Sequence, residues 1–298
     1  MVRRKPAKLL SPVRFWVPPY ISFGENLLFL VATPIGNLSD FSYRAIETLR
    51  DSAYILCEDT RISARLLEHY QIQTPLKSFH LFSEAQKEDS IIADLKDLKQ
   101  IALISDAGTP AIADPGERLV KRCIEEGITV SVIPGANAII TALAGSGLLT
   151  IPFQFLGFFP RNGQERAKAL MQLMEYEGTS IVYESPHRIG SLIKTLSKID
   201  PERQLVIARE LTKKFEEYIR GEAFELVEKL PSLVKGEIVL LVDRKKEQNP
   251  YLEMDPKEHV QLLMDQYGLT KNEAIKTVAS LHQSSKQELY NQFINEDD

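Results

Sequence analysis

The sequence predicts an α/β protein with two domains, each a parallel sheet covered by helices, and a small helical appendage at its C-terminal end. Short apolar runs alternate with amphipathic stretches from Leu27 onward, a pattern typical of parallel strands joined by helices. A second series of the same kind begins near Phe153, and the strand signal stops after Asp243. With 298 residues, 44% of them hydrophobic, the chain is long and apolar enough to fill two cores.

The order of these patterns predicts four parts: a basic N-terminal extension over residues 1–26, an N-terminal α/β domain over 27–145, a C-terminal α/β domain over 150–243 and a helical appendage over 251–298. The first 24 residues contain five basic and no acidic side chains but few serines, which favours a flexible tail over an organelle transit peptide. Glycines at 145 and 147 interrupt the hydrophobic periodicity of both helix and strand, and so predict the joint between the domains. Residues 244–250 are typical of a polar linker.

In the N-terminal domain we expect strands over 27–33, 53–57, 101–105 and 129–133, because these runs are short and rich in Val, Ile and Leu. Helices are predicted between them over 41–49, 62–69, 90–98 and 116–126. Asp114 and Pro115 predict the cap and first turn of the last helix, and Gly127 predicts its left-handed end.

In the C-terminal domain the same criteria predict strands over 153–157, 179–183, 204–208 and 237–242, with helices over 164–176 and 189–196. The appendage contains helix-length stretches over 270–281 and 284–293.

Composition excludes several classes of protein. The net charge is −5, so a contact with nucleic acid must be local. The only cysteines are Cys57 and Cys123, and the five histidines are widely spaced, which argues against a disulfide framework and a structural metal. No apolar run reaches the ~18 residues of a membrane span. We therefore expect a cytoplasmic protein without metal or membrane contact.

Each strand of the N-terminal domain is followed by a loop of small, proline or acidic residues. In a parallel sheet such loops meet at one edge, where these folds bind ligands. Turn chemistry alone explains any single loop, but four of them at one edge favour a binding site. Since no phosphate-binding glycine motif occurs, a nucleoside without phosphates, such as S-adenosylmethionine, fits this edge. The ligand candidates from these loops are Pro34, Gly36, Asp59, Asp106, Gly108, Thr109, Pro110, Pro134, Gly135, Asn137 and Ala138.

Charged residues also follow two strands of the second series. They comprise Glu184, His187, Arg188, Arg209, Glu210 and Lys213. Such a group can bind phosphate and remove a proton from a hydroxyl, or it can be an ion-pair network that joins two loops.

Aromatic and basic residues lie together after the strand that begins at Phe153. Phe158, Phe159 and Arg161 are followed by Arg166 and Lys168, a composition suited to stacking on an unpaired base and contacting phosphate. A helix with an exposed basic face explains the same residues. Lys214 is a further candidate for RNA contact.

Taken together, the motifs resemble those of the 16S ribosomal RNA (cytidine-2′-O)-methyltransferases of the RsmI type, in the tetrapyrrole methylase superfamily. The resemblance covers residues 27–243 and rests on the segments Thr33-Pro-Ile-Gly-Asn-Leu38, Glu58-Asp-Thr-Arg61, Ser105-Asp-Ala-Gly-Thr-Pro110, Pro134-Gly135, Gly157-Phe-Phe-Pro160, Tyr183-Glu-Ser-Pro-His-Arg188, Ala208-Arg-Glu-Leu-Thr-Lys213 and Lys235-Gly-Glu-Ile-Val239. One segment departs from the family pattern, because Ala136 and Asn137 follow Pro134-Gly135 where the family usually has Pro and then Ser or Cys.

The resemblance implies a homodimeric enzyme that uses S-adenosylmethionine to methylate a cytidine 2′-hydroxyl in 16S ribosomal RNA, within the small (30S) subunit. It adds Ala113, Tyr183 and Glu184 to the candidates for donor binding. We expect Glu184, His187 or Glu210 to act as base and Arg188 or Lys213 as its electrostatic partner. Two alternatives stay open: a methyltransferase of the same fold that acts on a tetrapyrrole or a translation-factor side chain, and a non-catalytic RNA-binding protein.

Overall fold

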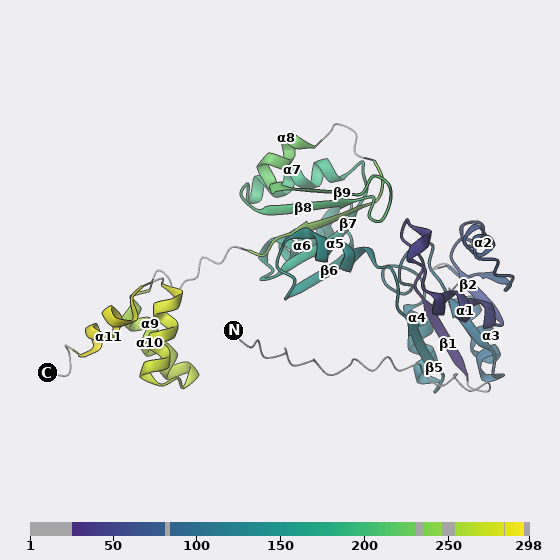
Figure 1. Ribbon diagram of the computed structural model, residues 1–298, viewed down its shortest axis with the longest axis horizontal. Helices are drawn as coiled ribbons and strands as arrows, with labels where there is room; N and C mark the ends of the chain where they lie inside the picture. Colours follow the sequence, from purple (N-terminus) through teal and green to yellow (C-terminus); the bar gives the residue numbers. More distant parts are fainter. Residues whose placement is uncertain (1–25, 81–83, 231–234, 246–253, 283, 295–298) are drawn as a thin grey trace, which may run out of the picture.

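The computed structural model describes residues 26–80, 84–230, 235–245, 254–282 and 284–294. This part of the chain contains two five-stranded sheets, each with its own helices, and a C-terminal group of helices (Figure 1). The predicted two-sheet α/β fold is confirmed. The predicted basic extension lies outside the described residues except for Asn26, as does the predicted linker from residue 246 onward.

The first sheet is entirely parallel, with the strand order β3-β2-β4-β1-β5. Its strands are β1 (Leu27–Val31), β2 (Tyr54–Cys57), β3 (Leu76–Ser78), β4 (Gln100–Leu103) and β5 (Thr129–Ile133). The central strands β1, β2 and β4 are apolar and almost wholly buried, because helices cover both faces of the sheet. All four predicted strands are present, and the short edge strand β3 was not predicted.

Two helices cover each face of the first sheet. On one face Leu49 of α1 (Tyr43–Asp51) and Leu67 of α2 (Thr60–His69) are part of one buried cluster with β1 and β2. On the other face Ile91 of α3 (Glu84–Lys96) and Leu119 of α4 (Glu117–Glu125) form a second cluster. A short 3-10 helix, η1 (Leu38–Asp40), precedes α1.

The predicted cap of α4 is wrong, although the predicted range of 116–126 agrees with the helix to within one residue. The helix is capped by Gly116, which has φ 129°, rather than by Asp114, and Pro115 lies before the helix. A Cβ on Gly116 would lie 2.6 Å from Leu103 Cδ2, so glycine is needed at this turn. Asp114 therefore belongs to the loop between β4 and α4. The predicted end is confirmed, because Gly127 follows the helix with φ 69°.

The second sheet is mixed, with the strand order β6-β7-β10-β8-β9, and corrects the expectation of a second parallel series. Its strands are β6 (Phe153–Phe158), β7 (Thr179–Glu184), β8 (Gln204–Arg209), β9 (Glu217–Glu222) and β10 (Ile238–Val242). Only β6 and β7 pair in parallel; β10 runs antiparallel to both of its neighbours, β7 and β8. Consequently β7 and β8 end at the same edge, where Glu184 and Arg209 both stand opposite Ile238.

Three helices cover one face of this sheet: α6 (Gly163–Glu175), α7 (Ile189–Ile199) and α8 (Ala223–Lys229). The other face is covered by α5 (Ala138–Ser146), whose Ile139, Ala142 and Leu143 pack against β7, β8 and β10. This helix was not predicted, and it contains most of the predicted joint. By its packing α5 belongs with the second sheet; the domain boundary at residue 145 stays a prediction.

The C-terminal helices α9 (Pro256–Tyr267), α10 (Lys271–Leu281) and α11 (Lys286–Ile294) pack on one another around a small core of their own, which includes Val260 and Leu289. They form a separate group in Figure 1. The two helices predicted here correspond to α10 and α11, whereas α9 was not predicted. In the part of the chain that the structure describes, no helix is both long and apolar enough to span a membrane.

Candidate active site

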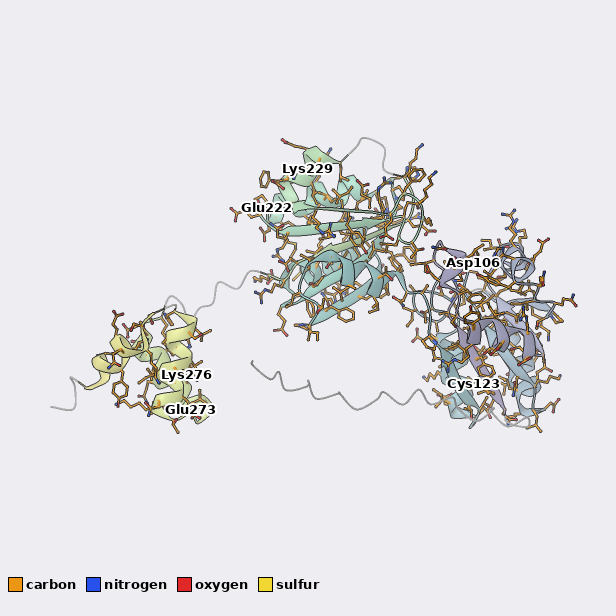
Figure 2. All side chains as sticks on the ribbon, in the orientation of Figure 1. Asp106, Cys123, Glu222, Lys229, Glu273 and Lys276 are labelled. Carbon is orange, nitrogen blue, oxygen red and sulfur yellow. The ribbon has the colours of Figure 1, made fainter. Side chains whose placement is uncertain are left out.

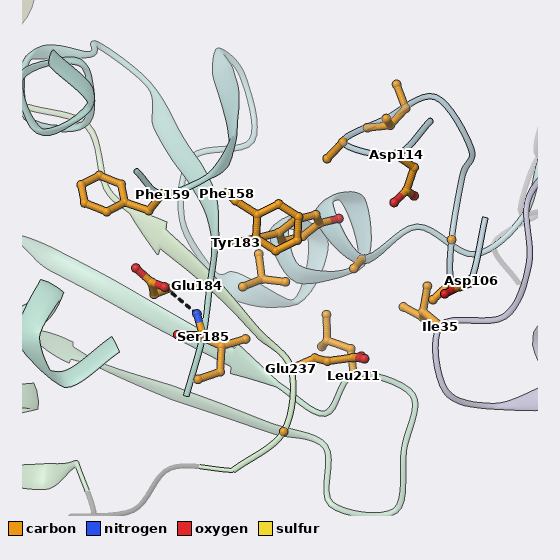
Figure 3. Close-up of a pocket in the computed structure, with 18 of the residues that line it drawn as sticks. Ile35, Asp106, Asp114, Phe158, Phe159, Tyr183, Glu184, Ser185, Leu211 and Glu237 are labelled. Carbon is orange, nitrogen blue, oxygen red and sulfur yellow. Dashed lines mark hydrogen bonds between the residues drawn. The ribbon is translucent and has the colours of Figure 1, made fainter. Parts of the chain in front are cut away.

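A cavity of about 1070 Å³ lies between the two sheets. One side is formed by the loops that follow strands of the first sheet, and the other by the ends of β6, β7 and β10 of the second (Figure 3). In Figure 2, Asp106 lies at the end of the first sheet nearer the second domain, and Cys123 lies toward the opposite end. The predicted binding edge of the first sheet therefore faces the second sheet.

The loop after β4 ties the other loops of the first sheet together. Thr33 and Gly108 exchange two backbone hydrogen bonds, of 2.8 and 3.1 Å. Asp106 Oδ1 accepts from the Asp59 backbone N–H at 3.2 Å, and Asn137 Nδ2 donates to Thr109 Oγ1 at 3.3 Å. The four loops thus converge on residues 105–109, as the parallel sheet predicts.

Three carboxyl groups line the first-domain side of the cavity: Glu58, Asp106 and Asp114. Burial raises the pKa of Asp114 to about 6; the charge of Glu58 and, less strongly, that of Asp106 act in the same direction, against a hydrogen bond with Ser105. Burial also raises the pKa of Asp106. The salt bridges of the described residues include none to these three groups, so the charge of this side is available to a cationic ligand.

The second-domain side is aromatic and apolar. The Phe158 ring is 65% exposed and lies 5.2 Å from the Tyr183 ring, between centroids, and Tyr183 in turn contacts Phe155. Burial, together with the charges of Asp114 and Glu237, raises the pKa of Tyr183 to about 12, so it is a neutral phenol near pH 7. Leu211 and Val239 also line the cavity and pack in one apolar cluster with Tyr183 and Phe155, so they form an apolar strip of its wall.

Glu184 and Arg188 form an ion pair at the edge of the cavity, in which the Glu184 side chain is buried and that of Arg188 is 30% exposed. Arg188 Nη2 lies 2.5 Å from Glu184 Oε1, and this oxygen also accepts from the Ser185 backbone N–H at 2.6 Å. Arg188 Nη2 further donates to the Phe159 carbonyl at 2.9 Å. The pair therefore joins the ends of β6 and β7.

The structure separates the predicted donor-binding residues into two groups. Those that line the cavity are Asp106, Gly108, Thr109, Ala113, Asn137, Ala138, Tyr183 and Glu184. Those outside its lining are Pro34, Gly36, Asp59, Pro110, Pro134 and Gly135. Several of the second group have structural contacts instead: Asp59 caps α2 and pairs with Arg61, which lowers its pKa to about 2, and Gly135 packs closely on Ala32.

The predicted catalytic residues are also divided. Glu184, His187 and Arg188 line the cavity, but Glu210 and Lys213 do not. Lys213 Nζ bridges Glu210 and Glu237 at 3.0 and 3.1 Å. Burial alone would raise the pKa of Glu210, but hydrogen bonds from Lys213 and the Glu237 N–H outweigh it and lower that pKa. Glu210 is therefore an ion-paired carboxylate that fixes a loop.

Among the predicted RNA contacts, Phe158 and Arg161 line the cavity and are exposed, whereas Arg166, Lys168 and Lys214 lie outside its lining. The expectation that Phe159 stacks on a base is corrected, because its ring is 1% exposed and packs in the core of the second domain. Arg166 lies over this buried ring rather than over an open one.

Sequence reasoning missed several residues of the cavity. The main ones are Ile35, Glu58, Ile112, Asp114, Leu211 and Glu237. Asp114 was missed because Asp-Pro before an amphipathic stretch is also a helix-start signal. Its position in the loop after a predicted strand was a signal for the binding edge. Glu58 directly follows another predicted strand and carried the same signal.

Comparisons with known proteins agree with this architecture. A family model described as tetrapyrrole (corrin/porphyrin) methylases matches residues 27–227. The chain is 43% identical over 273 residues to "Ribosomal RNA small subunit methyltransferase I" of Halalkalibacterium halodurans, covering 90% of this chain and 94% of the relative. The protein of the same name from Bacillus subtilis is 40% identical over 275 residues, with 90% and 94% covered.

Solved structures share the fold at much lower identity. Uroporphyrin-III-C-methyltransferase from Thermus thermophilus superimposes with a TM-score of 0.53 at 18% identity, over 74% of this chain and 94% of the other. A diphthine synthase superimposes with a TM-score of 0.57 at 16% identity, over 73% and 89% of the two chains. These likenesses support the fold alone. The relatives with 40–43% identity bear the name of a ribosomal RNA methyltransferase, and this favours an RNA acceptor over the acceptors that the names of these two structures indicate.

Proposed function

Because this chain belongs to the tetrapyrrole methylase family, and within it to the ribosomal RNA small subunit methyltransferases I, we propose that it methylates small-subunit ribosomal RNA. It is a methyltransferase. The proposed reaction transfers a methyl group from S-adenosylmethionine to the ribose 2′-hydroxyl of a cytidine. The observation that carries the proposal is the cavity in which motifs from both domains meet.

The first-domain side of the cavity fits S-adenosylmethionine. The carboxyl groups of Glu58 and Asp106 suit a ligand that carries a sulfonium and an ammonium charge, and Gly108, with φ 84°, leaves the loop backbone open to close approach. We assign donor binding to Asp106, Gly108, Thr109, Ala113, Asn137 and Ala138, with Tyr183 closing the opposite side. When bound, the donor supplies an electrophilic methyl carbon on a positively charged sulfur.

The second-domain side fits a nucleotide. Phe158 offers an exposed ring that Tyr183 supports from behind, which suits stacking on an unpaired base. Arg161 is exposed beside it and suits a phosphate contact. The Glu184–Arg188 pair acts as a positioning element. Arg188 binds the Phe159 carbonyl, and this contact fixes the segment that joins Phe158 to Arg161.

Rate acceleration in this site comes mainly from alignment. Two ligands held on opposite sides of one cavity meet without the entropy cost of a free encounter. The apolar strip of Leu211 and Val239 excludes water from the space between them. His187 also lines the cavity and remains a candidate proton acceptor on the second-domain side.

Family membership supports the wider setting of the reaction. We propose that the enzyme is a homodimer that acts in the cytoplasm on assembled small subunits, where the target nucleotide is presented within folded RNA. The relatives named above are methyltransferases of small-subunit ribosomal RNA, which argues against a non-catalytic RNA-binding role.

A mass map of ribose methylation in small-subunit RNA, from cells with and without this protein, tests the proposal. We expect one 2′-O-methylcytidine to be absent without the protein and restored by the purified enzyme with labelled S-adenosylmethionine. An unchanged map, with label passing instead to a porphyrinoid or a protein side chain, would contradict it.

A further inference from the structure

We propose that Asp114 is the general base that accepts the proton of the ribose 2′-hydroxyl during methyl transfer. The inference deepens the proposed function and rests on it. It assigns a catalytic role to a side chain of the first domain, whereas the sequence motifs directed attention to Glu184, His187 and Glu210 of the second.

Asp114 has the position that the role requires. It belongs to the β4–α4 loop, which also provides Gly108, Thr109 and Ala113 to the proposed donor site. In Figure 3 its carboxyl group points into the cavity, toward the side from which Phe158 and Tyr183 project. The effect of its charge on the Tyr183 pKa agrees with this proximity. A ribose whose base stacks on Phe158 and whose 2′-oxygen faces the donor therefore has Asp114 beside it.

Asp114 also differs from the other carboxyl groups in its partners. Glu184 is bound by Arg188, and Glu210 by Lys213, so the negative charge of each is already neutralised by a cation. Asp106 is occupied as an acceptor for the Asp59 N–H, which links two loops. The salt bridges of the described residues include none to Asp114, whose side-chain partner is the Ser105 hydroxyl. Its carboxylate can therefore accept a proton without breaking an ion pair.

The environment of Asp114 tunes it for proton transfer. The acidic groups that face it are Glu58, from the loop after β2, and Asp106, from its own loop, and Tyr183 lies opposite. Burial and the two negative charges raise its pKa to about 6, closer to neutral pH than that of an ordinary aspartate. A base works best when its pKa lies near the operating pH, and Asp114 is ionised above pH 6. The rate of methyl transfer should therefore rise with pH through about 6.

The backbone holds this carboxyl group in place. Ala111 and Ala113, which precede it in the loop, have φ values of 66° and 61°, in the left-handed region that residues other than glycine rarely adopt. Gly116 closes the loop against Leu103. Strained loops of this kind persist where the surrounding structure fixes them, and they are frequent at catalytic sites.

The proposed step balances without a further reactant. The ribose oxygen forms a bond to the methyl carbon while the carbon–sulfur bond breaks and its electron pair stays on sulfur. The hydroxyl proton passes to an Asp114 carboxylate oxygen. The products are a neutral thioether, a ribose methyl ether and a protonated Asp114, which returns its proton to solvent.

The test uses the full-length enzyme, labelled S-adenosylmethionine and small subunits isolated from cells that lack this protein. Single-turnover rates are measured from pH 5 to 9 for wild type, Asp114→Asn, Asp114→Glu and His187→Ala, and donor affinity is measured by calorimetry. Glu117→Gln, an exposed carboxylate of the same segment in the first turn of α4, is the matched control.

We expect Asp114→Asn to lower the rate about 10²–10⁴-fold, the usual contribution of a general base, and to remove the rise through pH 6, while donor affinity changes less than threefold. Asp114→Glu should restore part of the rate, and Glu117→Gln should match wild type.

Two results would overturn the assignment: an Asp114→Asn enzyme with the wild-type pH profile and a rate within threefold, or a loss of donor affinity as large as the loss of rate. The assignment would also be overturned if His187→Ala, rather than Asp114→Asn, removed the rise in rate through pH 6. Failure of the wild-type enzyme to form 2′-O-methylcytidine would instead contradict the proposed function.

Discussion

The two sides of the cavity differ in charge, in chemistry and in the kind of sheet that supports them. The first-domain side consists of small residues and three carboxyl groups on loops of an all-parallel sheet. The second-domain side carries Phe158, Arg161 and the Glu184–Arg188 ion pair near the strand ends of a mixed sheet. The former suits a cation and the latter suits stacked bases and phosphate.

This difference shows how one family can serve several acceptors. With the donor and the acceptor assigned to opposite sides as proposed, the donor side can stay unchanged while the opposite side is altered. Each sheet also has its own buried clusters, so a change in one domain need not disturb the other. The comparison predicts that substitutions on the two sides have separable effects.

The largest expected effect tests the independence of the two cores. Leu240 is fully buried at the centre of β10, and Leu240→Ala should lower the free energy of unfolding of the second domain by about 2–5 kcal/mol. Hydrogen exchange should accelerate in β7 and β8 and stay unchanged in β1 and β4. The control is Leu149→Ala, because that side chain is 39% exposed. Equal acceleration in both sheets would mean that the domains unfold as one unit.

The next effect concerns the aromatic side. Phe158→Ala should weaken RNA binding by about 1–3 kcal/mol, which is the usual contribution of one stacked base. Affinity for the methyl donor should be unchanged. Filter binding with small-subunit RNA and calorimetry with S-adenosylmethionine measure the two quantities, and Phe224→Ala, another exposed phenylalanine, serves as control. A variant that lost donor affinity alone would reverse the assignment of the two sides.

A smaller effect is expected on the acidic side. Asp106→Ala removes the acceptor that links the loops after β2 and β4, and should weaken donor binding about tenfold, or ~1.4 kcal/mol. RNA affinity should stay constant. Asp97→Ala, an exposed carboxylate of the same domain, is the control in the same calorimetric titration. Unchanged donor affinity in Asp106→Ala would remove this residue from the binding site.

The smallest effect distinguishes charge from stacking. Arg161→Gln should lower RNA affinity modestly and reduce the slope of log affinity against log salt by about 0.7–0.9, the value for one lost phosphate contact. Lys198→Gln, an exposed cation of α7, should leave the slope unchanged. If both variants gave the wild-type slope, Arg161 would contact no phosphate.

Much of the fold could be predicted from the sequence because most strands are short apolar runs bounded by turns. What was missed lacks those signals. The helix α5 is apolar on nearly every side, because the second sheet and the first domain both contact it, so it shows no amphipathic period. The edge strand β9 contains Glu217, Arg220 and Glu222, and its polar character obscured it. The antiparallel direction of β10 depends on a pairing between residues far apart in sequence.

The candidate site was predictable to a similar degree. Convergence of the four loops follows from the parallel sheet, and Gly108, Thr109 and Asn137 lie where the motifs indicated. Adjacent side chains of an extended segment point in opposite directions, so one of the rings of Phe158 and Phe159 was bound to face away from the cavity, but the sequence did not show that it is Phe159 that fills the core. The contact between Glu210 and Glu237 was equally hidden, because Glu237 lies just before β10, far from Glu210 in the sequence.

The central position of β10 in the second sheet affects how this protein folds during translation. It is the last strand of its sheet to be translated, yet it lies between β7 and β8, which do not pair with each other without it. A nascent chain that has reached residue 230 therefore exposes two unpaired apolar strand edges. All strands of the first sheet precede residue 134, so the first domain can fold on the ribosome, while the second sheet must wait for its final strand to insert. Premature termination or slow translation of that segment should leave the chain dependent on chaperones.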